Sequence, residues 1–274
     1  MRGRSIKLSL PRRLVGDLMR FSVGVPRITV QRNMKIDRLL HARSQASKRP
    51  SWTVLFLKGY ALLAQEVPDL RRAYVKLPSP RLYEYPVSVA SLAYEREFGD
   101  ERAVLLGRIK APENLAIAEI EAAIVEARSR PLGEVKDFRR ALKFARLPAP
   151  LRHFLMWLGL NIGRQRANFF GTFQLSVYSG LGAESFNPLS PLTTLFNYGP
   201  IDKEGRVSVR IHYDHRVMDG ANVARALERF EAILNGAVTE EVNGLNQNKP
   251  GVRAERQRSS SIAATKDGLS SKVP

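Results

Sequence analysis

The sequence predicts an α+β domain in which helices pack against a mixed β-sheet. Its 274 residues, 44% of them hydrophobic, suffice for one large domain or two small ones. The expected element order, β-α-β-β-α followed by β-β-β-α, contains hairpins, which a doubly wound nucleotide-binding fold lacks. The expected strands are residues 25–31, 86–92, 103–109, 173–177, 194–198 and 207–213.

Three stretches have the apolar spacing of helices. Residues 53–65 are apolar on nearly every side, which predicts a buried helix that ends before Pro68, because the residue before a proline leaves the helical region. Residues 113–128 place isoleucines on one face, with Pro112 setting the first turn. An amphipathic helix follows the last strand and stops at Asn235-Gly236.

Residues 131–170 do not fit this simple pattern. They contain basic helical pieces and an apolar stretch, 154–160, and they either pack on the core or lie at an interface. The stretch is far shorter than the roughly 20 residues that a membrane-spanning helix needs, so we expect no membrane span.

The net charge of +18 is concentrated at the two ends of the chain. Residues 1–49 carry +11 and residues 243–274 carry +4. A basic end attracts RNA, anionic lipid, an acidic protein or a phosphate-rich ligand, and composition does not separate these. Nucleic acid is the least favoured partner, because residues 1–49 lack the interleaved aromatics of a base-stacking surface.

We therefore divide the chain into three parts. Residues 1–24 are a basic N-terminal segment, residues 25–242 are the folded domain with an insertion near 131–170, and residues 243–274 are a disordered basic tail. The tail is expected to be disordered because it has too few apolar residues to bury.

The N-terminal segment is not a secretory signal, since no apolar h-region follows its positive charge. Its Arg- and Ser-rich composition suits a mitochondrial presequence, but the helical spacing of Leu14, Leu18 and Phe21 favours a first helix of the fold. The absence of cysteine excludes disulfides and thiolate metal sites and suits a reducing compartment. We expect a cytoplasmic protein, or one of the mitochondrial matrix if the source is eukaryotic.

Two candidate motifs are set aside. The glycines at 180 and 182 follow a strand, but the third glycine of a dinucleotide fingerprint is missing and prolines obstruct the helix that should follow. His212 and His215 with Asp214 between them suggest a metal site, yet residues 212 and 215 of one strand point to opposite faces. We expect no metal.

The most informative segment is Tyr213 to Gly220, which lies at the end of a strand and just before a helix. A histidine fixed by a strand terminus, with an aspartate four residues later and then a glycine, suits a general base in a tight turn. His215 and Asp219 are the residues concerned. Taken alone, this spacing is a weak signal, and a buried, hydrogen-bonded structural histidine is its default interpretation.

Three blocks of sequence resemble one known family, in the same order. They are Asp-His-Arg-Val-Met-Asp-Gly-Ala at 214–221, Gly171-Thr-Phe-Gln-Leu-Ser176, and the apolar helix followed by Val67-Pro-Asp-Leu70. They are similar to blocks of the catalytic domain of dihydrolipoamide acyltransferases of 2-oxo acid dehydrogenase complexes. The resemblance implies the two-layer α+β sandwich of chloramphenicol acetyltransferase.

It also implies acyl transfer between coenzyme A and another acceptor, with acyl-CoA as a substrate. His215 would take a proton from the attacking thiol, Ser176 would donate a hydrogen bond to the oxyanion, and Asp219 would hold the turn around His215. Members are homotrimers or multiples of trimers with the active site between subunits, so His215 and Ser176 would meet across an interface.

The sequence departs from the family at three points. We expect no lipoyl domain on this chain, because 25 residues before the first strand are too few, so a lipoyl-bearing partner protein would deliver the substrate in trans. The segment between Ser176 and His215 is shorter than in typical members, and residues 131–170 are inserted. There are two alternatives. One is an acyltransferase of the same fold with a small-molecule or carrier-protein acceptor, and the other is a non-catalytic scaffold or assembly protein.

Overall fold

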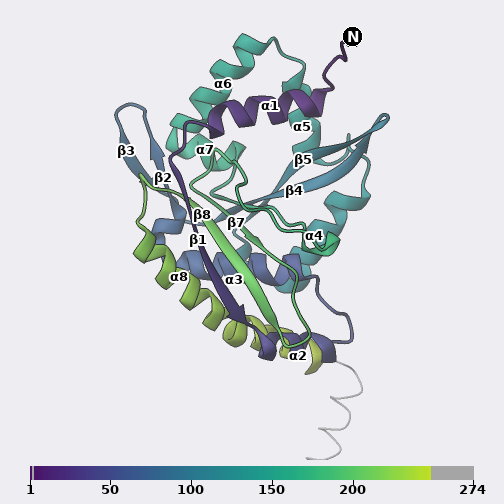
Figure 1. The fold of residues 1–274 in the computed structure, drawn as a ribbon, viewed down its shortest axis with the longest axis vertical. Helices are drawn as coiled ribbons and strands as arrows, with labels where there is room; N and C mark the ends of the chain where they lie inside the picture. Colours follow the sequence, from purple (N-terminus) through teal and green to yellow (C-terminus); the bar gives the residue numbers. More distant parts are fainter. Residues whose placement is uncertain (2, 248–274) are drawn as a thin grey trace, which may run out of the picture.

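A six-stranded mixed β-sheet organises the chain (Figure 1). The computed structural model describes residues 1 and 3–247. Strand order is β1-β8-β7-β6-β4-β5; β4, β6 and β7 run parallel to one another, whereas the other neighbours pair antiparallel. The strands are β1 Arg27–Lys35, β4 Val89–Phe98, β5 Glu101–Lys110, β6 Phe173–Leu175, β7 Thr194–Tyr198 and β8 Arg206–Asp214. The predicted mixed sheet of an α+β domain is confirmed.

Helices cover the sheet and close its upper end in the view of Figure 1. A separate hairpin of β2 Arg72–Val75 and β3 Arg81–Glu84 stands beside them. The helices are α1 Leu10–Ser22, α2 Asp37–Gln45, α3 Trp52–Glu66, α4 Ile117–Ser129, α5 Lys136–Ala145, α6 Ala149–Asn161, α7 Gly163–Phe169, α8 Gly220–Ile233 and α9 Thr239–Gln247. None of the described helices is long and apolar enough to cross a membrane.

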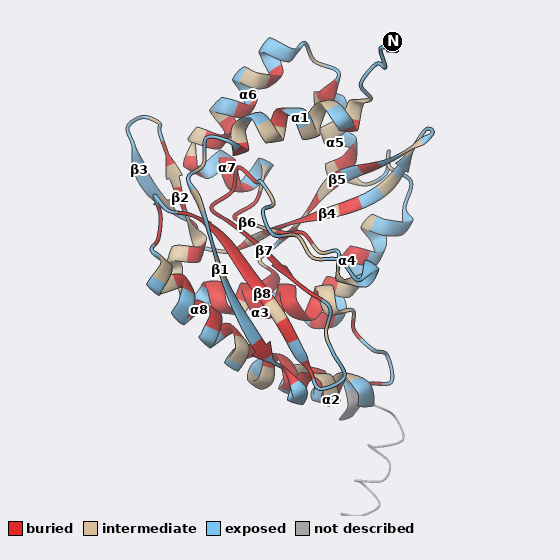
Figure 2. Cartoon of the chain, viewed as in Figure 1, coloured by how far each residue is buried: buried red, intermediate tan, exposed pale blue. Residues whose placement is uncertain are grey.

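An aromatic cluster between α3, α8 and the sheet forms the centre of the core. Tyr60 stacks on Phe196 with ring centroids 4.3 Å apart, and Phe56 stacks on Tyr198 at 3.9 Å. Phe230 of α8 meets three of these rings edge-on. The red interior of Figure 2 includes the middle of α3, where nearly all residues from Val54 to Ala64 are buried, as expected from its apolar sequence. Its end before Pro68 is also confirmed.

Two predicted helix boundaries are wrong. The last helix does not stop at Asn235-Gly236: a π-helical turn, Leu234–Val238, leads into α9. Leu234 and Val238 are buried, and the Thr239 hydroxyl donates to the Leu234 carbonyl at 2.8 Å, so tertiary packing outweighs the weak helix propensity of glycine. Pro112 starts a separate 3-10 turn, Pro112–Asn114, and α4 begins only at Ile117.

The chain ends differ from their expected division. Residues 10–22 form α1, which confirms the predicted first helix. Residues 243–247 of the expected tail belong to α9, and residues 248–274 lie outside the described residues. Residues 131–170 form α5, α6 and α7, and they both pack on the core through Phe138 and leave one face of α6 exposed.

Removing the Phe230 ring should destabilise the fold strongly. Phe230→Ala leaves a cavity among the aromatic rings, and such truncations cost about 3–5 kcal/mol in the free energy of unfolding. Denaturant unfolding measures this loss. The control is Val125→Ala on α4, whose side chain is 52% exposed and should change stability by less than about 0.5 kcal/mol. Equal effects of the two variants would contradict the central position of the cluster.

Candidate active site

The turn after β8 is fixed by backbone hydrogen bonds from three segments. The Asp214 amide donates to the Thr193 carbonyl at 2.8 Å, and the His215 amide donates to the Pro26 carbonyl at 3.0 Å. The Val217 amide closes the turn on the Asp214 carbonyl at 2.9 Å. The chain is therefore held against both neighbouring strands at the point where His215 leaves the sheet.

An ion pair between the buried Asp214 and the partly exposed Arg216 also holds this turn. The Asp214 side chain is fully buried and accepts from Nε and Nη2 of Arg216 at 2.9 and 2.7 Å. The Arg216 amide donates to the same carboxylate at 3.0 Å. The guanidinium also stacks on Tyr74, 4.5 Å from the ring centroid. A bidentate pair restrains direction as well as distance, so it sets the course of the chain on both sides of His215.

The imidazole of His215 faces solvent, with its side chain 45% exposed. Nδ1 lies 3.2 Å from the Met218 carbonyl oxygen and 3.4 Å from Oδ1 of Asp219. Both neighbours only accept hydrogen bonds, so Nδ1 must carry the proton and Nε2 keeps the lone pair. With Nδ1 engaged by these two oxygens, Nε2 is the ring nitrogen left to act as a general base.

Asp219 touches the imidazole and does not cap the following helix. It occupies the N-cap position of α8, but its side chain makes no capping hydrogen bond. Its backbone carbonyl accepts from the amides of Asn222 and Val223 instead. The carboxylate is 79% exposed. Asp214 and the Met218 carbonyl make hydrogen bonds within the turn. The Asp219 carboxylate contacts the imidazole of His215.

Ser176 lies just after β6 and is 7% exposed. Its amide donates to the Phe196 carbonyl at 3.4 Å. Leu175 pairs with Phe196, so the next residue, Ser176, lies opposite Asn197 of β7. Asn197 pairs in turn with Arg210 of β8, so Ser176 is level with Arg210 along the strands. His215 is five residues further along, which is about 17 Å at 3.3 Å per residue. A single chain therefore does not bring Ser176 and His215 together.

Two arginines that the sequence analysis missed bind the backbone of the loop at residues 190–192, beside this turn. Arg27 of β1 donates through Nη2 to the carbonyls of Ser190 and Leu192, and Arg166 of α7 donates to that of Pro191 at 2.8 Å. The same loop supplies the Thr193 carbonyl that receives the Asp214 amide. Their spacing in sequence carries no recognisable signal, since each binds main-chain carbonyls of a distant segment.

His212 is separated from His215 by its burial. Its side chain is fully buried, and Nδ1 lies 2.7 Å from the Thr29 hydroxyl. Within residues 1 and 3–247 no group of three or more His, Cys, Asp or Glu side chains has the arrangement of a metal site.

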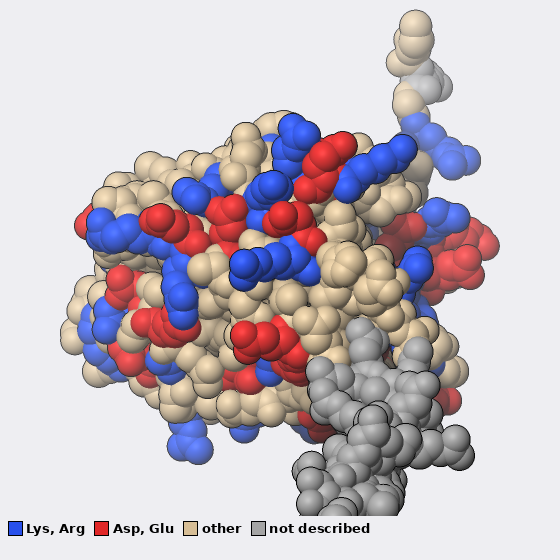
Figure 3. Space-filling view, turned by 90° about the horizontal axis from the view of Figure 1, so that it is seen from below, with Lys and Arg blue, Asp and Glu red and all other residues tan. Residues whose placement is uncertain are grey.

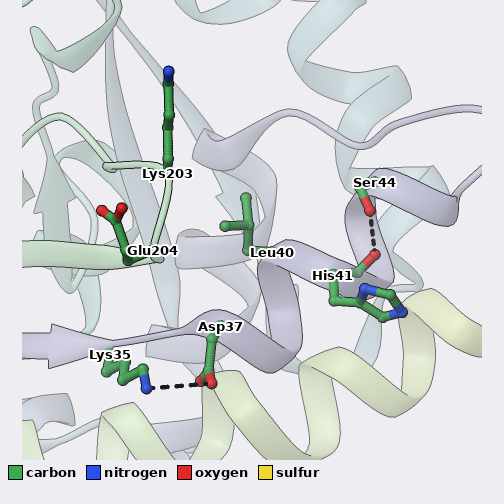
Figure 4. Close-up of a pocket in the computed structure, with 7 residues that line it drawn as sticks. All are labelled: Lys35, Asp37, Leu40, His41, Ser44, Lys203 and Glu204. Carbon is green, nitrogen blue, oxygen red and sulfur yellow. Dashed lines mark hydrogen bonds and ion pairs between the residues drawn. The ribbon is translucent and has the colours of Figure 1, made fainter.

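A surface cavity lies at the other end of the sheet (Figure 4). Its volume is about 520 Å³. Lys35 lines it at the end of β1, whereas Arg27, at the start of β1, pairs with Asp214 next to His215. Eight residues of strand correspond to about 26 Å, so this cavity is not part of the candidate site. It is lined by Lys35, Asp37, Leu40, His41, Ser44, Lys203 and Glu204.

The sheet order and the histidine turn together define a chloramphenicol acetyltransferase-like fold. The dihydrolipoamide acetyltransferase of Azotobacter vinelandii superposes with a TM-score of 0.62 at 18% identity, over 86% of this chain and 94% of that one. The catalytic core of the 2-oxoacid dehydrogenase multienzyme complex of Thermoplasma acidophilum gives 0.60 at 18%, over 85% and 99%. Chloramphenicol acetyltransferase gives 0.51 at 14%, over 83% and 96%.

These likenesses confirm the fold that the three sequence blocks implied. No family model and no curated protein matches the sequence. Work on the Azotobacter protein concerns the role of a serine, a histidine and an asparagine in its catalytic mechanism. There the histidine lies 52 positions after the serine and the asparagine four positions after the histidine.

Stability should fall in mild acid because of His212. Burial, with the Arg27 and Arg210 cations nearby, lowers the pKa of the His212 imidazole from 6.5 to about 4. Between these values the unfolded chain binds more protons than the folded one, so stability is complete above pH 6.5 and falls as the pH drops toward 4. The loss reaches about 3 kcal/mol at 1.4 kcal/mol per pKa unit.

Denaturant unfolding across this range checks the prediction with His212→Asn, which removes the titrating ring. The variant should show a flatter pH dependence than the parent protein. His41→Asn, a change at an exposed histidine, should leave the slope unaltered. Parallel curves for the parent and the His212 variant would contradict the assignment.

Proposed function

We propose that this protein is an acyltransferase that moves an acyl group between coenzyme A and a thiol acceptor of the dihydrolipoyl type. The observation that carries the proposal is the solvent-facing imidazole of His215, whose Nδ1 is occupied by the Met218 carbonyl. A lone pair held outward at the end of β8 is what proton abstraction from a thiol needs. The fold shared with dihydrolipoamide acetyltransferase cores supports the same activity.

In this mechanism His215 Nε2 takes the proton of the attacking thiol. A thiol has a pKa of about 8.5 and an ordinary histidine about 6.5, so the transfer is modestly uphill and depends on positioning. The thiolate attacks the thioester carbonyl, and the carbonyl oxygen becomes an oxyanion. When the tetrahedral intermediate collapses, the second thiolate leaves and takes the proton from His215.

Ser176 would stabilise the oxyanion by donating a hydrogen bond from its hydroxyl. Because about 17 Å of sheet separates it from His215 within one chain, the partner serine would come from a neighbouring subunit. We therefore propose a homotrimer, or a multiple of trimers, with each site built between two chains. The multienzyme cores that share the fold support an oligomer.

Asp219 stands in the position that the Azotobacter protein fills with its asparagine, four residues after the histidine. Its carboxylate lies 3.4 Å from Nδ1 and would favour the imidazolium formed during proton transfer. Since the carboxylate is 79% exposed, water screens most of this interaction. The Met218 carbonyl performs the main orienting role.

A second candidate function keeps the chemistry but changes the acceptor to a small molecule or a carrier protein. Only 39 positions separate Ser176 from His215, against 52 in the Azotobacter protein. The shorter loop is tied through Pro191 to Arg166 of α7, within the inserted helices. Mass spectrometry of the products formed from acyl-CoA with each acceptor separates the two candidates. For the first candidate function, the expected donor or acceptor of the acyl group is a lipoyl-bearing partner protein.

Substitution of the two proposed active-site residues should abolish most acyl transfer. His215→Ala removes the base, and Ser176→Ala removes the oxyanion donor; each should lower kcat by about 10²–10³-fold. A thiol-release assay with acyl-CoA and dihydrolipoamide measures the rates, and circular dichroism verifies folding. Unchanged turnover in the folded His215 variant would refute the enzymatic proposal.

A mixture of the two inactive variants should regain activity. If each site combines His215 of one subunit with Ser176 of the next, every hybrid trimer contains one intact site, and random mixing restores about a quarter of all sites. The variants are unfolded together and refolded together. The control is the same mixture of separately refolded proteins. No recovery in verified hybrids would contradict a site shared between chains.

Asp219→Asn should reduce acyl transfer only slightly. The screened contact of an exposed carboxylate accounts for less than about a tenfold change in rate. The same assay, run beside His215→Ala, gives the comparison. A loss as large as that of the histidine variant would mean that Asp219, and not Met218, orients the ring.

A further inference from the structure

Helix α6 is turned with its apolar face outward. Leu151, Phe154, Leu155 and Leu158 recur at the spacing of a single helix face. Phe154 is 58% exposed and Leu151 43%, and Trp157 beside them is 38% exposed. The buried face instead contains Arg152, Met156, Gly159 and Leu160. In an ordinary surface helix the apolar stripe faces the core, whereas this outward stripe has no partner among residues 1 and 3–247.

Phe169 of α7 is a further exposed aromatic residue next to α6. It is 60% exposed, and a Cβ placed on Gly159 of α6 would lie 3.8 Å from its ring. The exposed part of α6 is pale blue at the upper end of Figure 2. We call Leu151, Phe154, Leu155, Trp157 and Phe169 the apolar stripe.

The sequence that contains the stripe is rich in cations and lacks carboxylates. Residues 138–183 contain seven Lys and Arg and no Asp or Glu. Five of these cations are exposed: Arg139, Arg140, Lys143, Arg146 and Arg164. In Figure 1, α1, α5 and α6 lie together at this end of the molecule, and α1 adds exposed Arg12 and Arg20.

The carboxylates that α1 meets are already paired. Asp17 is the only acidic residue before position 37, and it is bound by Arg152 at 2.7 Å and by His153 at 2.9 Å. Glu101 of β5 accepts from the Ser9 hydroxyl at the start of α1. By contrast, Lys and Arg are interspersed with Asp and Glu on the face that Figure 3 shows. Helices α1, α5, α6 and α7 together contain ten Lys and Arg against two acidic residues, Asp17 and Asp137.

We propose that the apolar stripe and its cations form a docking surface for an anionic phospholipid membrane. A helix with Phe, Trp and Leu on its outer face and basic residues beside it lies in the interface of a bilayer, with its apolar side chains among the acyl chains. The surrounding Lys and Arg add attraction to anionic headgroups.

Vesicle flotation of the full chain tests the proposal. The protein should float with vesicles of phosphatidylcholine mixed with phosphatidylglycerol, but not with phosphatidylcholine alone, and salt should weaken binding. Phe154→Ser should lower the partition coefficient by about 10- to 100-fold, as expected for one buried aromatic side chain. Replacing Arg139, Arg140 and Lys143 together by Gln should lower it on the order of 100-fold.

Matched controls separate this surface from the general basicity of the chain. Val125→Ser changes an exposed apolar residue of α4, and joint replacement of Lys35, Arg38 and Lys203 by Gln removes three exposed cations at the opposite end of β1. Both should bind vesicles like the parent protein. In Trp52→Phe, Trp157 is the only remaining tryptophan, and its fluorescence should shift to the blue on anionic vesicles.

Three results would overturn the proposal. One is equal loss of binding in the stripe variants and their controls. Another is Trp157 fluorescence that does not respond to bound vesicles. The third is a Phe154→Ser variant that still binds vesicles but changes its oligomeric state in analytical ultracentrifugation. That result would assign the stripe to contact with a second copy of the chain.

Discussion

The buried carboxylate at the end of β8 is the constraint on which the site depends. An ionised side chain without solvent must be paired, and Arg216, two residues later, is the group that pairs with Asp214. To reach it the chain must leave the sheet and fold back at once. His215 lies between the two, and its side chain is therefore directed away from the core, while Asp214 points inward. The Asp214–Arg216 pair thus fixes the conformation of the turn and leaves the His215 side chain accessible to solvent.

The aromatic core holds this turn from the other side. α8 begins at Gly220, where a Cβ would lie 3.3 Å from the Tyr213 hydroxyl, so a small residue allows the helix to start close to the strand. Further along, Phe230 packs against the rings of α3 and β7. Strand, turn and helix are thus fixed at both ends, which leaves little freedom for the Met218 carbonyl that orients the imidazole.

Periodicity predicted those elements whose burial follows one simple pattern. Helix α3 is buried on all sides and β8 alternates between the core and the opposite face, so both were located within one residue. The β2–β3 hairpin and α2 were missed, because four-residue strands and a helix with only Leu39 and Ala42 buried show too little periodicity. The extension beyond Gly236 was missed because packing against α3, and not local propensity, maintains it.

The site was predictable to the extent that its residues are neighbours in sequence. His215, Asp219 and the turn between them form one motif, and the structure has them in contact. Ser176 was predicted within a strand, 173–177, but β6 ends at Leu175 and Ser176 follows it. Its distance from His215 depends on strand register across three strands. Arg27 and Arg166 bind carbonyls far away in the chain, and such contacts arise only from the tertiary fold.

The orientation of α6 shows how charge and burial are linked at the upper end of the molecule. Its inward face contains Arg152, which is 6% exposed and paired with the equally buried Asp17 of α1. Replacing a buried ion pair with packed apolar side chains is often neutral or stabilising, so stability alone does not favour this arrangement over an inward-facing stripe. The pair does fix which face of α6 turns inward and joins α1 to the inserted helices. An apolar surface and an excess of cations, separate in the sequence, therefore become neighbours on one end of the protein.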